Sequence, residues 1–126
     1  MNMTIGVDIF NVKRIKQAMA ENQDYITYVF SEEEIRLSEG HADAGYYYGS
    51  LFSIKEAMFK SLNIFWQDEM DWKDFNVSSV PYSHPRVFLS GKTKALVDSA
   101  NQLSFSASNS YDGDYIMSSV LCIRDN

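Results

Sequence analysis

An acidic and a basic side chain stand one helical turn apart within a long apolar segment. Glu56 and Lys60 have the i, i+4 spacing that brings two side chains together on a helix, and Phe52 and Phe59 lie one turn to either side of the glutamate. On spacing alone, this is a surface Glu–Lys pair worth only ~0.3–0.5 kcal/mol. A carboxylate among aromatic side chains must otherwise find a cation, a metal or several donors, so the pair is also a candidate for chemistry.

A second carboxylate, Asp8, lies in an alternating segment near the N-terminus. Apolar side chains alternate over residues 4–9 with Thr4, Gly6 and Asp8, which predicts a half-buried strand with the aspartate on the face away from the core. Taken alone, such an aspartate faces solvent. One carboxylate on a strand and one on a helix can also converge on Mg²⁺, which uses few protein carboxylates and keeps positions open for phosphate oxygens and water. A nearby lysine would then neutralise a pyrophosphate.

Length and composition limit the classes of protein to consider. A chain of 126 residues with 45% hydrophobic side chains predicts one folded domain covering residues 1–126. The net charge of −6 argues against nucleic-acid binding. No signal peptide begins the chain and no stretch is long enough to cross a bilayer, so we expect a cytoplasmic protein without a membrane segment. The single cysteine, Cys122, is expected to be a small buried residue rather than a nucleophile.

Local patterns predict four helices. Asn11 is a candidate N-cap for a helix that ends near Glu21, and Ser31 followed by three glutamates predicts a capping box. The longest helix is expected over residues 44–62. Because it is apolar nearly all round, it should be largely buried. A fourth helix is expected over residues 91–100.

The remaining pattern is that of strands and turns. Besides the first strand, four more are expected, at residues 75–80, 86–89, 103–108 and 115–123. Pro81 and Pro85 mark a turn, and residues 109–114 are expected to form a hairpin loop. The fold class is therefore α+β, with a short antiparallel sheet packed on a long buried helix.

Six segments, in order, resemble the holo-acyl-carrier-protein synthase family of 4′-phosphopantetheinyl transferases. They are GVDIF near the start, FSEEEI at 30–35, FSIKEAMFKSL at 52–62, WKDFNV at 72–77, PRVFLSGK at 85–92 and SFSASNS before DYIMSSVL. The family pattern has a GxDI start, an FxxxE helix, an FAxKEAxxKA helix, a WxDI/V strand, a PxVxLxG segment and an SxSHS hairpin. The most specific part is KEAMFK preceded by an N-terminal GVDI, and the likeness covers essentially the whole chain.

The resemblance implies an activity and roles for three residues. Asp8 and Glu56 match the Mg²⁺-binding acids, and Lys60 matches a lysine that stabilises negative charge on the coenzyme A phosphates. Together they would be the catalytic residues for attack of a carrier serine on the β-phosphorus. A metal-positioned water or Glu56 itself would accept the serine proton. The products would be holo-carrier protein and adenosine 3′,5′-bisphosphate.

The resemblance also implies binding sites and partners. The coenzyme A site would be lined by Phe52, Lys60, Pro85, Ser108 and Asn109. Basic Arg14 and Lys13 on the first helix would face an acidic acyl carrier protein, although a solvated basic face explains Lys13 equally well. Members of the family form homotrimers with active sites at subunit boundaries.

This chain departs from the family pattern at positions near coenzyme A. Leu51 replaces an arginine that helps to hold coenzyme A, which removes a bidentate contact worth ~1.5–3 kcal/mol. Asn109 replaces a histidine and cannot become a cation. Asn63 replaces a glycine, a mild change because asparagine tolerates a left-handed helix end. The alternative to an active transferase is therefore a degenerate homologue that binds a carrier protein or a nucleotide without turnover.

Overall fold

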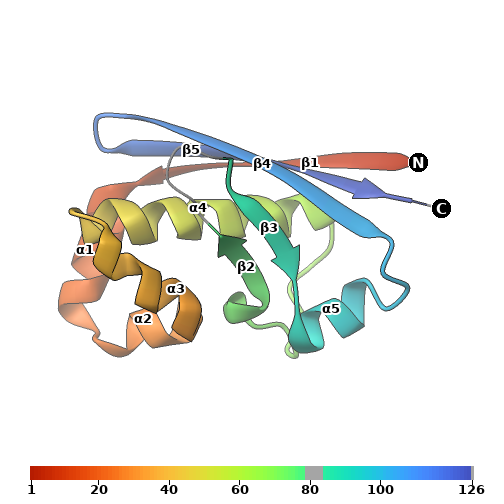
Figure 1. Ribbon diagram of the computed structural model, residues 1–126, viewed down its shortest axis with the longest axis horizontal. Helices are drawn as coiled ribbons and strands as arrows, with labels where there is room; N and C mark the ends of the chain where they lie inside the picture. The colour runs from red at the N-terminus through yellow and green to blue at the C-terminus, as the bar shows by residue number, and fades with distance from the viewer. Residues whose placement is uncertain (79–83, 126) are drawn as a thin grey trace.

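The structure, a computed structural model, describes residues 1–78 and 84–125 and confirms the α+β fold class (Figure 1). The helices are α1 (Val12–Glu21), α2 (Asp24–Val29), α3 (Glu32–Leu37), α4 (Ala44–Leu62) and α5 (Gly91–Val97), with 3₁₀ turns η1 (Ser38–Gly40) and η2 (Trp72–Asp74). The strands are β1 (Asn2–Asn11), β2 (Phe75–Ser78), β3 (Arg86–Leu89), β4 (Leu103–Asp112) and β5 (Tyr115–Arg124). No helix in the described part of the chain is long and apolar enough to cross a membrane.

Two antiparallel sheets pack on the long central helix. The larger sheet has the strand order β1-β5-β4, and the smaller one pairs β2 with β3. In Figure 1, α4 runs along one face of the larger sheet, with α1–α3, β2 and α5 on the far side of the helix. The expected short sheet on a long buried helix is therefore present, with α4 between the sheet and the rest of the chain.

A glycine brings β1 against the backbone of α4. A Cβ atom at Gly6 would lie 2.0 Å from the carbonyl oxygen of Ala57 and 2.6 Å from the amide nitrogen of Ser61. The hydroxyl of Thr4 also donates to the Ser61 carbonyl, at 2.5 Å. Any side chain at position 6 would push the helix away, so this contact fixes how closely the neighbouring Asp8 approaches α4.

The prediction that Asp8 lies on the face of β1 away from the core is wrong. Asp8 points toward α4 together with Gly6 and Phe10 and is only 9% exposed. The opposite face of β1 carries the exposed apolar side chains, which are Met3, Ile5, Val7 and Ile9. Alternation located the two faces correctly, but the small Gly6 lets the helix pack on the more polar face.

Several expected boundaries also change. Strand β4 continues through Asn109 to Asp112, so the hairpin turn is only the two residues 113–114, with Gly113 at φ +59°. Helix α5 ends at Val97 rather than at residue 100, and the short helix α2 was not expected. Strand β2 is described only to Ser78, so residues 79–80 of the expected strand and Pro81 lie outside the described residues.

The predicted helix ends are confirmed. Asn11 caps α1 by accepting from the amide of Lys13 at 3.0 Å, and Ser31 and Glu34 form the capping box of α3. Helix α4 spans the expected residues 44–62 and ends at Asn63 in the left-handed conformation, with φ 59°. Local sequence therefore determines where these helices begin and end.

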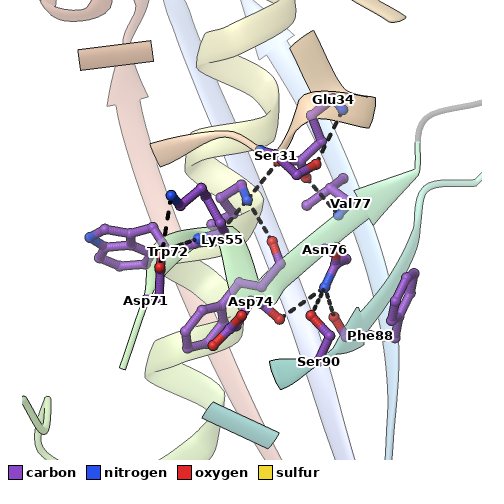
Figure 2. A network of polar contacts seen from close by, with 12 residues as sticks. Ser31, Glu34, Lys55, Asp71, Trp72, Asp74, Asn76, Val77, Phe88 and Ser90 are labelled. Atoms are coloured by element: carbon purple, nitrogen blue, oxygen red, sulfur yellow. Dashed lines mark hydrogen bonds and ion pairs between the residues drawn. The ribbon is translucent and has the colours of Figure 1, made fainter. Parts of the chain in front are cut away.

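A buried ion pair fastens the face of α4 that lies away from the larger sheet (Figure 2). The ammonium of Lys55, which is fully buried, lies 2.9 Å from Glu34 Oε1 and donates to the carbonyl oxygens of Trp72 and Phe75 at 2.9 and 2.6 Å. Glu34 Oε2 accepts from the amide of Val77 at 3.0 Å. Burial lowers the pKa of Lys55, and the Glu34 carboxylate opposes that effect. The pair fixes the rotation of α4 about its axis.

Candidate active site

The carboxylate of Asp8 is held between β1 and α4 by two donors. Ser53 Oγ donates to Asp8 Oδ2 at 3.0 Å, and Lys60 Nζ lies 3.1 Å from Oδ1. Lys60 also donates to the carbonyl oxygen of Val7 at 3.2 Å. Because Lys60 is half exposed while Asp8 is nearly buried, the charged end of the lysine stands at the mouth of this arrangement.

Glu56 shares the electrostatic environment of Asp8 and Lys60. Burial and the neighbouring Asp8 carboxylate raise the pKa of Glu56, while Lys60 and Arg14 lower it. Consecutive residues lie about 100° apart around a helix, so the fixed Lys55 directs Glu56 to a different side of α4. The structure thus bonds Asp8 to Lys60 and places Glu56 within electrostatic reach of both, and we call Asp8, Glu56 and Lys60 the acid–lysine cluster.

Aromatic side chains border the cluster on the side of α1 and α2. The Phe52 ring lies 5.4 Å from that of Phe10 and 6.4 Å from that of Tyr25, and the Arg14 guanidinium is 5.6 Å from the centre of the Phe10 ring. Burial and then the negative charge of Glu56 raise the pKa of Tyr25. Sequence reasoning did not single out Tyr25, because no pattern predicted α2.

A cavity of about 780 Å³ lies at the opposite edge of the larger sheet from the cluster. Its lining includes His41, Tyr46, Tyr47, Leu51, Asn109 and Tyr111. Leu51 is nearly fully buried, and among the described residues no lysine or arginine lines this cavity, although Lys16 pairs with the lining Asp43 at 3.6 Å. Asn109 therefore lies in a lining of mixed aromatic and polar side chains, and it is separated from Asp8 by β5.

The other expected binding residues are spread over the molecule. Ser108 lies exposed on β4, and the half-buried Pro85 directly precedes β3. Lys13 is exposed on α1 and pairs with Asp114 at 3.4 Å, next to the exposed Arg14. Within one chain, the residues expected to bind coenzyme A thus lie on both sides of α4, and their binding roles remain predictions.

The described residues contain no group of three or more His, Cys, Asp or Glu side chains that could hold a metal ion. The acid–lysine cluster instead supplies two carboxylates, a donor set of the size that Mg²⁺ takes from proteins when phosphate and water complete its shell. Cys122 is buried and unpaired, and burial raises the pKa of its thiol, as expected for an inert cysteine.

The model of the 4′-phosphopantetheinyl transferase superfamily matches residues 4–119, so the chain belongs to this superfamily. This confirms the family resemblance seen in the sequence.

Individual relatives agree with this assignment. The holo-[acyl-carrier-protein] synthase of Caldanaerobacter subterraneus subsp. tengcongensis is 27% identical over 98% of this chain and 96% of its own length. That of Clostridium kluyveri is 31% identical over 75% of this chain and 69% of its own. The Helicobacter pylori enzyme, solved in complex with coenzyme A, is 27% identical with a TM-score of 0.72 over 96% of this chain and 99% of that one. The Chronobacterium ammoniagenes ACPS–CoA complex, 19% identical, has the same fold with a TM-score of 0.87 over all of both chains.

Proposed function

We propose that this protein transfers the 4′-phosphopantetheine group of coenzyme A to a serine of an acyl carrier protein. The observation that carries the proposal is the acid–lysine cluster, in which Asp8 is bonded across the β1–α4 contact to Lys60, and in which burial and then Asp8 raise the pKa of Glu56. Membership of the 4′-phosphopantetheinyl transferase superfamily, together with relatives that are holo-[acyl-carrier-protein] synthases, supports this choice of reaction.

Asp8 and Glu56 would hold Mg²⁺. Two mutually repelling carboxylates, one of them with a raised pKa, gain from a shared divalent cation, and this supports the assignment. When bound, Mg²⁺ supplies neutralising charge at the pyrophosphate oxygens. Lys60, whose charged end is half exposed, would turn toward the same oxygens and stabilise the charge that develops as the phosphoanhydride bond breaks.

Glu56 would act as the general base. A carboxylate has two oxygens, so one could bind the cation while the other accepts the proton of a nearby hydroxyl. The serine oxygen forms a bond to the β-phosphorus, and the bond from that phosphorus to the bridging oxygen breaks. The serine proton passes to Glu56, and adenosine 3′,5′-bisphosphate leaves.

A homotrimer with active sites at subunit boundaries would unite the two halves of the coenzyme A site. The cluster lies at the β1 edge, whereas Asn109 and the 780 Å³ cavity lie at the β4 edge of the same sheet. The exposed apolar face of β1, with Ile5 and Ile9 at 64% and 65% exposed, would be covered in such an assembly. The coenzyme A complexes of the Chronobacterium ammoniagenes and Helicobacter pylori proteins support the same ligand here.

The carrier would approach over α1, in the cytoplasm. Arg14 is exposed beside the aromatic border of the cluster, and its positive charge, after that of Lys60, partly opposes the rise in the pKa of Glu56. A basic group at this position would attract an acidic carrier protein and direct its serine toward the cluster. Lys13 would add to the same field from the next exposed position on α1.

Chromatography of the nucleotide product tests the proposal. The protein is incubated with an apo carrier protein and coenzyme A, with Mg²⁺ or with a chelator, and adenosine 3′,5′-bisphosphate is measured. We expect the product only when the carrier and Mg²⁺ are both present. If the folded protein releases no product with several carriers while still binding coenzyme A, Leu51 and Asn109 mark a loss of catalysis, and the non-catalytic binding protein is the correct reading.

A further inference from the structure

Every fourth residue on the face of α4 that meets the larger sheet lies over one pair of neighbouring strand residues, and we call each such pair a row. Four helical residues rise about 6 Å and two strand residues about 6.6 Å, so the two patterns stay in step over several rows. Gly49 lies over Ile116, which pairs with Phe10, and Ala57 lies over Gly6. The residue one turn from each, Ser53, therefore lies over the row that contains Asp8.

Two buried serine hydroxyls flank Asp8 in this row. Ser53 from α4 and Ser118 from β5, the strand partner of Asp8, are both 0% exposed. Ser53 Oγ donates to Asp8 Oδ2 at 3.0 Å. Ser118 Oγ, in contrast, is buried and has no hydrogen-bond partner among the described residues. The two serines thus have the same size and burial and differ in whether they contact Asp8.

We propose that Ser53 is a positioning residue that fixes the carboxylate of Asp8 for binding a divalent cation. With Oδ2 held by a serine that is itself locked in the core, the plane of the carboxylate cannot rotate freely. Oδ1 then remains directed at Lys60 and toward the accessible side of the cluster. Groups that orient a metal ligand in this way contribute on the order of tenfold or more to metal affinity. The inference rests on the proposed function, because it concerns Mg²⁺ at Asp8.

The test compares Ser53→Ala with Ser118→Ala in the full chain. Binding of Mn²⁺ is measured by water proton relaxation in the presence of coenzyme A, and the Mg²⁺ dependence of transfer is measured separately. We expect Ser53→Ala to raise the Kd for Mn²⁺ and the KM for Mg²⁺ on the order of tenfold, with little change in kcat at saturating Mg²⁺. Ser118→Ala should leave both constants unchanged, because its hydroxyl is bonded to nothing that binds the cation.

Ser53→Cys and a folding measurement distinguish loss of the hydrogen bond from loss of the fold. The thiol keeps a donor at this position but is larger and a weaker donor than the hydroxyl, so a folded Ser53→Cys variant should fall between wild type and Ser53→Ala. Thermal unfolding of all three variants identifies any that are not folded. Equal effects of Ser53→Ala and Ser118→Ala on Mn²⁺ binding would overturn the proposal, as would wild-type binding by Ser53→Ala.

Failure of the proposed function gives a different pattern. If wild type transfers no phosphopantetheine but Ser53→Ala still binds Mn²⁺ more weakly than Ser118→Ala, the reaction is wrong and the positioning role stands. If wild type transfers the group and Ser53→Ala matches it in every cation constant, only the positioning role is wrong. If wild type neither transfers the group nor binds Mn²⁺, both are wrong.

Discussion

The ammonium of Lys60 lies 3.1 Å from Asp8 Oδ1, where it neutralises the carboxylate that we assign to a divalent cation. A lysine and a cation that share one carboxylate compete for it electrostatically. In the free protein, Lys60 therefore acts as the counter-charge of Asp8, and it would be free to contact phosphate oxygens if a divalent cation were bound by that carboxylate.

Removal of the Lys60 charge should strengthen cation binding while it weakens catalysis. We expect Lys60→Met to lower the Kd for Mn²⁺ in the absence of coenzyme A about fivefold, equivalent to ~1 kcal/mol for a part-exposed charge pair. Transfer activity should fall, because the developing phosphate charge loses a partner. Lys92→Met, at an exposed lysine of α5, should change neither quantity. A weaker affinity for Mn²⁺ in Lys60→Met would contradict this account of Lys60.

Glu56 should make the free protein less stable as the pH rises. Its pKa in the folded protein lies above the ordinary value of 4.5, so the folded state holds the proton more tightly than the unfolded state does. The free energy of unfolding therefore falls as the pH rises from about the ordinary pKa through the raised one. Without divalent cations, Glu56→Gln should be more stable than wild type near pH 7, and the difference should shrink below pH 4.5. Equal melting temperatures of the two proteins at pH 7 would show that Glu56 carries no such penalty.

At the scale of elements, the buried pair between α3 and α4 controls the direction of the cluster. Lys55 and Glu34 connect α4 to α3, η2 and β2, and the amide of Val77 completes the set (Figure 2). Removal of either partner leaves the remaining one as an uncompensated buried charge. Such pairs are therefore far more sensitive to single substitutions than surface pairs are.

Loss of one member of this pair should destabilise the whole fold. We expect Lys55→Met to lower the free energy of unfolding by about 3–5 kcal/mol, measured by urea denaturation. Lys73→Met, which removes an exposed pair with Asp71 at 4.0 Å, should cost at most about 1 kcal/mol. The double variant Lys55→Met/Glu34→Gln should recover part of the loss. A Lys55→Met protein as stable as Lys73→Met would show that the buried charge is compensated in another way.

Sequence predicted the elements whose signals are local. The Asn11 cap, the capping box at Ser31 and the full extent of α4 follow from residues within a few positions of each other. The face of β1 that meets α4 could not be derived in this way. The face that is more apolar in sequence, with Ile5, Val7 and Ile9, is the exposed one, and the face with Gly6 and Asp8 is buried. The approach of Ala57 to Gly6 that decides it is a tertiary contact.

The candidate site was predicted from the same sequence only in part. The family motifs named Asp8, Glu56 and Lys60, and the structure brings these three together. Periodicity could not find Ser53 or Tyr25, since a small residue mid-helix and a tyrosine outside any expected helix carry no distinct signal. Their positions beside Asp8 and Phe52 depend on how separate elements pack.

In the whole molecule, α4 covers one face of the larger sheet (Figure 1). The other face carries exposed apolar residues. The exposed side chains include Ile5, Val7 and Ile9 of β1 and Tyr115 and Met117 of β5. An apolar surface of this kind on a folded protein marks an interaction site. Self-association through it would explain why the cluster and the cavity lie at opposite edges of one sheet.

A charge on this face should break the assembly. Light scattering coupled to size-exclusion chromatography should give wild type a mass three times the chain mass of 14.4 kDa. Ile5→Lys combined with Ile9→Lys should give the single-chain mass and little transfer activity, whereas Leu96→Lys, at an exposed leucine of α5, should keep the assembly. A monomeric wild type that is fully active would contradict shared active sites.

Transfer of a phosphopantetheine group by means of the acid–lysine cluster is the reaction that we assign to this chain. Its most direct test is intact-mass spectrometry of an apo carrier protein incubated with coenzyme A, Mg²⁺ and either wild type or Glu56→Gln. We predict that wild type adds the mass of one phosphopantetheine group to the carrier serine, and that folded Glu56→Gln adds it far more slowly. An unmodified carrier with wild type would contradict the transferase assignment, and equal modification by both proteins would contradict the role given to Glu56.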